Sequence, residues 1–286
     1  MRVGVIGIGR MGGAIAICLL DAGHEVVAHD VRAAELAALA AHPSGRATRA
    51  GSPREVAAKS DLIGIAVLDD AQLLDVLLGP DGALAGARSD SVVMIHSTVA
   101  LPTLRRAGEE AERRGVALVE AAVSGADGHR SIGQLCVMVG GERAAFERAR
   151  PVLDAIGSLV LHLGPLGAGM DAKLVRNAIV YQQFLAGYEG VRLAEVLGVP
   201  RDSLLRILEH TGVLGTNLSA FLGERGSMAP LGADEHERRR FFELTAATAR
   251  KDLAAALARA REVGLELPAT EQAAEQMAAV FGVGAA

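Results

Sequence analysis

Cysteine is scarce in this chain of 286 residues, and its scarcity excludes several kinds of site. The two cysteines, Cys18 and Cys136, each lie inside an apolar segment. Neither belongs to a CxxC pair or to a group of cysteines and histidines with the spacing of metal ligands. We therefore expect two buried free thiols, with no disulfide framework and no metal site.

The chain also lacks an excess of positive charge and lacks long uncharged apolar runs. Its formal net charge of -5 argues against a general nucleic-acid-binding surface. The basic run 238–240 follows Asp234, Glu235 and Glu237, so we interpret it as a solvated, self-neutralised face. No apolar run reaches the roughly 18 residues of a membrane span. The first β-type run begins at residue 2, which leaves no room for a signal or transit peptide. We expect a cytoplasmic protein that binds neither membranes nor nucleic acids.

A glycine-rich segment, Gly7-Ile8-Gly9-Arg10-Met11-Gly12, is the most informative feature that the chain does have. An apolar β-type run at 3–6 precedes it, and an apolar helical stretch at 14–20 follows it. A second β-type run at 25–29 then ends in Asp30. A strand, a glycine turn, a helix, a strand and an acid in this order are typical of dinucleotide binding, because the helix N-terminus and the open glycine backbone accommodate a pyrophosphate. The alternative is a tight turn without a ligand.

Asp30 predicts which dinucleotide binds. It stands 18 residues beyond Gly12, close to the spacing of the acid that bonds the adenosine ribose hydroxyls. A carboxylate at that place repels a 2′-phosphate and favours NAD over NADP. Arg32 leaves NADP open, since a nearby arginine can accommodate the phosphate. A turn-forming role for Asp30 is the other interpretation.

Alternating strand-like and helix-like segments indicate the fold class. After the first two strands, apolar β-type runs recur at 62–68, 92–95, 117–123, 135–139 and 159–163, with helical stretches between them. This pattern predicts a parallel, doubly wound sheet whose strands are buried on both faces.

Beyond residue 164 the pattern becomes helical. No proline interrupts residues 170–197, and Gly198 and Pro200 supply a stop. We expect an α/β Rossmann-type N-terminal domain over residues 1–163 and an all-α C-terminal domain over 164–286, joined by a long helix at about 170–197. So long a helix, roughly 42 Å, needs apolar cover on several sides and predicts a homodimer or homotetramer.

Polar residues follow three of the predicted strands. Leu68-Asp69-Asp70 and His96-Ser97-Thr98 follow the strands that begin at Leu62 and Val92, at the carboxyl ends where an open α/β sheet binds its ligand. Ser97 and Thr98 either contact the nicotinamide or its ribose, or cap a helix. Ser124 and Gly125 follow another strand, where a hydroxyl and free N–H groups can hold a substrate carboxylate, although turn chemistry explains the pair equally well.

The segment 167–177 reads G-x-G-x-x-x-K-x-x-x-N and contains Lys173 and Asn177. Four residues apart on a helix, the two share one face, which is otherwise apolar. A partly buried lysine can exchange a proton with a carbinol oxygen, and an asparagine can orient the lysine or the substrate. The alternative is a lysine whose stem lies along the helix end with its ammonium in water.

Four segments in order, GIGRMG at 7–12, VSG at 123–125, the 167–177 segment and Lys-Asp-Leu at 251–253, resemble the β-hydroxyacid dehydrogenase family. That family includes 3-hydroxyisobutyrate dehydrogenases and tartronate semialdehyde reductases and is related to 6-phosphogluconate dehydrogenase. The resemblance implies that Lys173 is the catalytic acid/base, that Ser124, Gly125 and Asn177 bind substrate, and that Lys251 closes over the cofactor. The cofactor-binding residues are then Gly7, Gly9, Arg10, Met11, Gly12, Asp30, Arg32, Leu68, Thr98 and Lys251.

The chain departs from the family's DAPVSGGxxGA pattern. It has Glu120 in place of the aspartate and Ala122 in place of the proline. Farther along, Ala126 and His129 each replace a glycine, and Arg130 replaces the alanine. We therefore predict an NAD(P)-dependent oxidoreductase that acts on a small β-hydroxy acid or its semialdehyde, without a prediction of which one. The alternatives are an imine or ketone reductase of the same fold, which usually lacks the lysine, and a non-catalytic dinucleotide-binding module.

Overall fold

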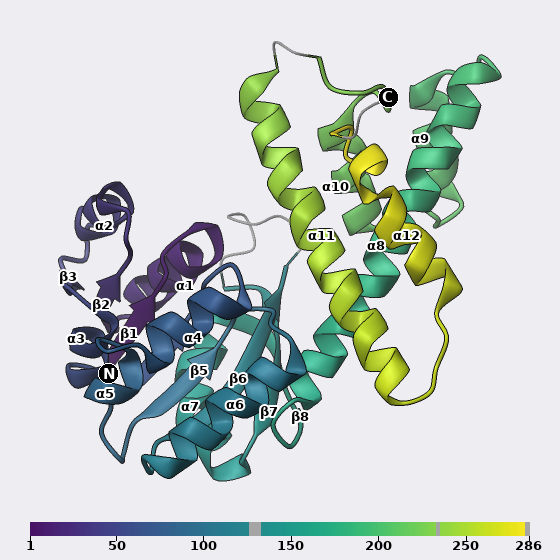
Figure 1. Cartoon of the computed structure of the whole chain (residues 1–286). Helices are drawn as coiled ribbons and strands as arrows, with labels where there is room; N and C mark the ends of the chain where they lie inside the picture. Colours follow the sequence, from purple (N-terminus) through teal and green to yellow (C-terminus); the bar gives the residue numbers. More distant parts are fainter. Residues whose placement is uncertain (126–132, 233–234, 284–286) are drawn as a thin grey trace. The chain divides into compact units, whose positions relative to one another are not determined.

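The computed structural model describes residues 1–125, 133–232 and 235–283. The chain forms two compact units, Met1–Lys173 and Leu174–Ala286. The first unit is a sheet covered by helices on both faces, and the second is helical (Figure 1). The predicted fold class is therefore confirmed. Helix α8 (Ala168–Val196) passes through the boundary between the units. No helix in the described part of the chain is long and apolar enough to cross a membrane.

The sheet has eight strands among the described residues, in the order β3-β2-β1-β4-β5-β6-β7-β8. Their bounds are β1 Arg2–Ile6, β2 Glu25–His29, β3 Ala47–Arg49, β4 Leu62–Ile65, β5 Val92–Ile95, β6 Ala117–Ser124, β7 Leu135–Gly141 and β8 Gly157–Gly164. Only β3, a strand of three residues, has no counterpart among the predicted strands. The carboxyl ends of β1, β4 and β5 meet at one edge, because these strands run parallel.

The prediction that the whole sheet is parallel is wrong for one pair. Strands β6 and β7 run antiparallel, with Ala122 opposite Met138. Residues 125–134 separate these two strands, and a parallel pair would need a crossover of a dozen or more residues. The short connection therefore reverses the chain direction.

Two apolar cores cover the two faces of this sheet. Side chains alternate between them along each strand, as in β5, where Val92 and Met94 face one core and Val93 and Ile95 face the other. Helices α1 (Arg10–Asp21), α2 (Ala33–Ala40) and α7 (Arg143–Ile156) pack in the first core. Helices α3 (Pro53–Ala58), α4 (Asp70–Leu78), α5 (Ala83–Gly86) and α6 (Leu101–Arg113) pack in the second.

The helical unit has its own core, built around aromatic rings. It contains most of α8 together with α9 (Arg201–His210), α10 (Thr216–Arg225), α11 (His236–Glu262) and α12 (Pro268–Val280). The Phe184 and Phe221 rings stack at 4.6 Å, and Phe281 meets Phe221 edge-on at 5.7 Å. These contacts join α8 and α10 to the residue that follows α12.

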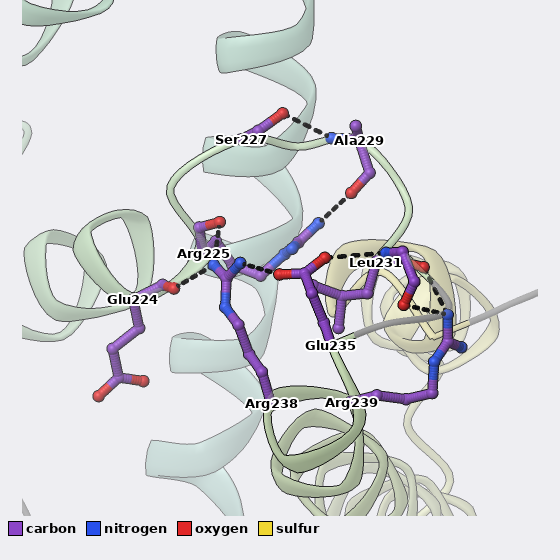
Figure 2. Close-up of polar contacts among 9 residues, drawn as sticks. Glu224, Arg225, Ser227, Ala229, Leu231, Glu235, Arg238 and Arg239 are labelled. Atoms are coloured by element: carbon purple, nitrogen blue, oxygen red, sulfur yellow. Dashed lines mark hydrogen bonds and ion pairs between the residues drawn. The ribbon is translucent and has the colours of Figure 1, made fainter.

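The basic run 238–240 takes part in holding the connection between α10 and α11 (Figure 2). The Arg238 guanidinium pairs with Glu235 at 2.7 Å and donates to the carbonyl oxygen of Arg225 at 2.6 Å. Arg239 donates to the carbonyl oxygen of Leu231. The pair with Glu235 agrees with self-neutralisation. The carbonyl contacts give two of these arginines a structural role that the interpretation as a solvated face did not include.

Candidate active site

The glycine turn between β1 and α1 is shaped so that side chains are excluded from it. Gly7 has a φ of +80°, which residues with a side chain rarely adopt. A Cβ on Gly12 would lie 1.9 Å from the carbonyl oxygen of Gly7, so the helix can approach the strand only with glycine there. Gly9 is the N-cap of α1 and provides no side-chain cap. The turn thus has the open backbone and the helix N-terminus that fit a pyrophosphate.

Asp30 lies at the end of β2, beside this turn, and is buried. One carboxylate oxygen accepts from the backbone N–H of Ile8 at 2.8 Å. Arg32 donates to both oxygens through its guanidinium, at 3.0 Å each, and to Oδ1 through its backbone N–H. Burial alone raises the pKa of Asp30, but the hydrogen bonds from Arg32 and Ile8 hold it below its usual value. The Asp30 side chain is therefore a fixed carboxylate.

Arg32 extends toward the glycine turn as well. Its Nη2 atom lies 3.2 Å from the place where a Cβ on Gly9 would be. Its guanidinium also pairs with Glu35 at 3.2 Å. The structure thus brings together the predicted cofactor residues Gly7, Gly9, Gly12, Asp30 and Arg32 at one edge of the sheet.

The ends of β4 and β5 are joined by the hydroxyl of Ser97, which accepts from the backbone N–H of Val67 at 2.8 Å. The helix-capping alternative for Ser97 and Thr98 is wrong, because the N-cap of α6 is Ala100. Thr98 is half-buried, and the Leu68 side chain is exposed. Leu68 follows β4, which lies beside β1, and Thr98 follows β5, which lies beside β4. Both residues are therefore at the same edge of the sheet as the glycine turn.

His96 is buried, and its Nδ1 lies 2.8 Å from the carbonyl oxygen of Ala121. Burial lowers its pKa to about 4, although the contact with Ala121 acts in the opposite direction. The imidazole is therefore neutral near pH 7. A ring with so low a pKa is a weak base and is not protonated to act as an acid at that pH.

This burial predicts an acid-sensitive fold. A histidine whose pKa falls on folding stabilises the protein fully above its unfolded value of 6.5 and loses that contribution as pH falls toward about 4. We expect the free energy of unfolding to fall by up to about 3 kcal/mol over this interval, at about 1.4 kcal/mol per pH unit. Denaturant titrations at several pH values would measure it. His96→Asn should flatten the slope, and exposed His210→Asn should not. Equal slopes in all three proteins would contradict the expectation.

The predicted substrate residues Ser124 and Gly125 lie at the end of β6. Ser124 is the last residue of the strand and is buried, and Gly125 is half-buried. Ala126, His129 and Arg130, which mark the departure from the family pattern, lie outside the described residues.

Lys173 lies in the first part of α8 and is buried, with 9% of its surface exposed. Its Nζ atom donates to the carbonyl oxygen of Val123 at 2.8 Å. The ammonium is thus held at the residue that directly precedes Ser124. Its burial and its hydrogen bond to the strand do not agree with a lysine whose ammonium extends into water.

Asn177 lies one turn farther along α8, within the helical unit, and is also buried. Its amide nitrogen donates to Asp252 at 2.7 Å, and its oxygen accepts from Arg176 at 3.1 Å. Lys251 pairs with Asp252 at 3.5 Å. Asp252 therefore contacts both Asn177, of the 167–177 segment, and Lys251, its neighbour in the Lys-Asp-Leu segment at 251–253.

Sequence reasoning missed two contributors to these arrangements. Asn217 accepts from the Arg176 guanidinium at 2.9 Å, and nothing in its sequence context indicated this. Glu120 was noted only as a departure from a pattern, yet it lies against the start of α8. The available signal was its place inside an apolar strand, since a charged side chain that is buried there needs a partner. Among the described residues, no group of three or more histidine, cysteine or acidic side chains could hold a metal ion.

Two protein-family models match nearly the whole chain. Residues 2–164 match the family model described as the NAD binding domain of 6-phosphogluconate dehydrogenase. Residues 167–285 match the one described as NAD-binding of NADP-dependent 3-hydroxyisobutyrate dehydrogenase.

Individual relatives cover most of the chain. An uncharacterized oxidoreductase of Mycobacterium tuberculosis is 34% identical over 99% of this chain and 94% of its own length. The NAD-dependent L-serine dehydrogenase of Pseudomonas aeruginosa is 32% identical over 73% of this chain and 70% of its own. The crystal structure of a 3-hydroxyisobutyrate dehydrogenase from Salmonella typhimurium superposes with a TM-score of 0.85 at 26% identity, covering 99% of this chain and 100% of that one.

Proposed function

Because this chain belongs to the β-hydroxyacid dehydrogenase family, we propose that it moves hydride between a nicotinamide dinucleotide and a small β-hydroxy acid or its semialdehyde. The observation that carries the proposal is the buried Lys173, whose Nζ lies 2.8 Å from the carbonyl oxygen of Val123 in the strand that ends at Ser124. A lysine kept out of water beside the proposed carboxylate site is suited to proton transfer at the reacting oxygen.

The chemistry needs one hydride and one proton. The nicotinamide, when bound, supplies or accepts the hydride at the carbinol carbon. In the reducing direction the Lys173 ammonium would donate a proton from Nζ to the carbonyl oxygen as that oxygen gains charge. In the oxidising direction the side chain would act as the neutral amine, whose Nζ lone pair accepts the proton of the hydroxyl. The hydrogen bond to Val123 uses one of the three N–H donors of the ammonium and fixes its direction.

We assign roles to the remaining predicted residues as part of the same proposal. Ser124 and Gly125 would hold the substrate carboxylate through a hydroxyl and a backbone N–H at the end of β6. Asn177 would orient the substrate, since its hydrogen bonds to Asp252 and Arg176 fix the amide plane. Arg10, Met11, Leu68, Thr98 and Lys251 would line the dinucleotide together with the glycine turn.

A substrate panel tests this function most directly. Short β-hydroxy acids and 2-hydroxy acids are offered with NAD and with NADP, and formation of the reduced nicotinamide is followed by absorbance. We expect turnover of at least one hydroxy acid, and in reverse of its semialdehyde. Reduction of cyclic imines without any hydroxy acid activity would contradict the proposal, and so would tight dinucleotide binding without turnover of any substrate.

We also expect NAD(H) to give a higher kcat/KM than NADP(H). The fixed carboxylate of Asp30 would accept from the ribose hydroxyls and repel a 2′-phosphate. Arg32 is the residue that moderates this preference, since its guanidinium lies between Asp30 and the turn.

The measurement is the ratio of kcat/KM for the two cofactors in the native protein and in Arg32→Leu. We expect Arg32→Leu to lower NADP(H) efficiency about 10-fold or more relative to NAD(H), because a charge-assisted contact to phosphate is lost. Arg46→Leu removes one positive charge beside the amino end of β3 and should leave the ratio unchanged. A native protein that uses NADP(H) equally well would show that Arg32 governs the site in place of Asp30.

Oligomerisation through the long helix stays a prediction. Val175, Ile179 and Leu193 of α8 are apolar and more than half exposed in the single chain, which supports a homodimer or homotetramer with its interface there.

A further inference from the structure

Glu120 lies in the middle of β6 and has no exposed surface. One oxygen of its carboxyl group, Oε1, accepts hydrogen bonds from the backbone N–H groups of Gly167 at 2.8 Å and Gly169 at 2.9 Å. Helix α8 begins at Ala168, between these two donors. Glu120 therefore binds the N-terminus of α8 from a different element, in the way that a capping side chain does.

Three glycines make room for this contact. A Cβ on Gly140, which pairs with Glu120 across the sheet, would lie 2.1 Å from Oε1. A Cβ on Gly169 would lie 2.5 Å from the carbonyl oxygen of Met138 in β7. Gly167 has a φ of +106°, which favours glycine. The first turn of α8 is thus seated against the backbones of β6 and β7 with the carboxyl group between them.

This arrangement is costly for the fold. Burial raises the pKa of Glu120, while the backbone hydrogen bonds from the start of α8 partly oppose that effect. The second oxygen, Oε2, has no hydrogen-bond partner among the described residues. A buried polar atom without a partner costs about 1–3 kcal/mol of stability. An apolar residue in the strand would avoid that cost but would leave the amides of Gly167 and Gly169 without this acceptor. Holding the start of α8 at this place has a further reason.

Lys173 supplies that reason. Gly169 and Lys173 are four residues apart on α8, so the bound amide and the lysine lie on the same face of the helix. Val123, whose carbonyl oxygen accepts from Lys173, is three residues after Glu120 on β6. Strand β6 therefore contacts the start of α8 at two points. Glu120 accepts from the N-terminal amides, and Val123 accepts from the Lys173 ammonium. Any slide of the helix start along β6 would carry Nζ with it.

We propose that Glu120 is a positioning residue, which fixes where α8 begins against β6 and so sets where the Lys173 ammonium stands relative to the substrate oxygen. This inference rests on the proposed function, in which Lys173 transfers the proton. Glu120 itself contacts no substrate.

The chain length of the residue at position 120 tests this directly. Glu120→Gln keeps an oxygen acceptor at the same distance from the backbone and should retain kcat within about 5-fold. Glu120→Asp is one methylene shorter and cannot reach both amides unless the helix moves. We expect it to lower kcat about 10-fold or more, because displacements near 1 Å can cost up to about 10²-fold. The dissociation constant for the dinucleotide should not change. Glu147→Asp, on the exposed surface of α7, is the matched control.

A double-mutant cycle separates positioning from general damage to the fold. In the Lys173→Ala background, Glu120→Asp should lower kcat no further, because the group that it positions is absent. A solvent isotope effect on kcat should increase in Glu120→Asp, since proton transfer becomes slower. Thermal unfolding of each variant establishes that it is folded. If Glu120→Asp does not fold, Glu120→Met, which keeps the length of the side chain but has no oxygen acceptor, takes its place with the same expected loss of kcat in the native background and none in Lys173→Ala.

Several outcomes would overturn the inference. An equal loss in kcat from Glu120→Asp with and without Lys173 would assign Glu120 a purely structural role. A loss in Glu120→Gln as large as that in Glu120→Asp would show that the charge matters and the position does not. If Lys173→Ala alone leaves kcat near normal, the proposed function of Lys173 fails, which is distinct from a failure of the role of Glu120.

Discussion

Lys173→Ala should lower kcat by about 10²-fold or more with the best substrate at saturation. Hydride transfer creates or consumes charge on the carbinol oxygen, and an ammonium held at a fixed place stabilises that charge more in the transition state than in the bound substrate. Losing a general acid/base has this size of effect in enzymes. The lysine is buried and donates to the carbonyl oxygen of Val123, so alanine also removes this hydrogen bond.

Two measurements make the result specific. The dissociation constant for the dinucleotide, measured without substrate, should change little, because the glycine turn and Asp30 are untouched. Lys59→Ala removes a lysine that pairs with Glu55 on the surface of α3, and its kcat should be native. A near-normal kcat in Lys173→Ala would refute the assignment. His96 would be a poor substitute, because a pKa of about 4 makes its ring a weak base and leaves it without a proton to donate near pH 7.

Gly12→Ala should weaken dinucleotide binding about 10-fold or more and destabilise the first unit. The added methyl group would lie 1.9 Å from the Gly7 carbonyl oxygen, which is a backbone atom and cannot swing aside. The start of α1 would have to move away from β1, and overpacking of this kind costs about 1–3 kcal/mol. The displaced amides would then no longer fit the pyrophosphate.

A second glycine in a helix provides the control. Gly190 in α8 has no atom within 4 Å of an added Cβ, so Gly190→Ala should be neutral or should stabilise by up to about 1 kcal/mol, the difference in helix propensity. Calorimetric titration with NAD and urea unfolding of both variants would measure the two effects. Native affinity in Gly12→Ala would mean that the turn relaxes without cost and that the close approach is not required.

Much of the site could be predicted because its signals are local. The glycine turn was predictable from six residues, since a tight turn, an open backbone and a close approach of helix to strand each require glycine at that spacing. The alternation of apolar segments likewise predicted the buried strands β4 and β5, whose residues are covered on both faces. Lys173 and Asn177 share a helix, so the helical period alone related them.

Other features depend on partners far away in the chain, and the sequence did not reveal them. Asp30 was predictable as the acid that follows the second strand, but its bonds to both Arg32 and the Ile8 amide depend on how β2 ends beside the turn. The capping interpretation of Ser97 failed because the hydroxyl bonds Val67 across two strands. The antiparallel pairing of β6 and β7 was missed because apolar strands look alike in either direction.

The sequence by itself determined the glycine turn, every strand of the described residues except β3, and the candidate residues for proton transfer, because these follow from local backbone preferences and from periodicity. Tertiary structure decided what each polar group bonds. It placed Glu120 beneath the start of α8, 47 residues away from Gly167, and brought Lys173 to Val123 across 50 residues. Hydrogen bonds and burial are formed between surfaces that only the folded sheet creates. A lysine's role therefore depends on a contact that no local pattern encodes.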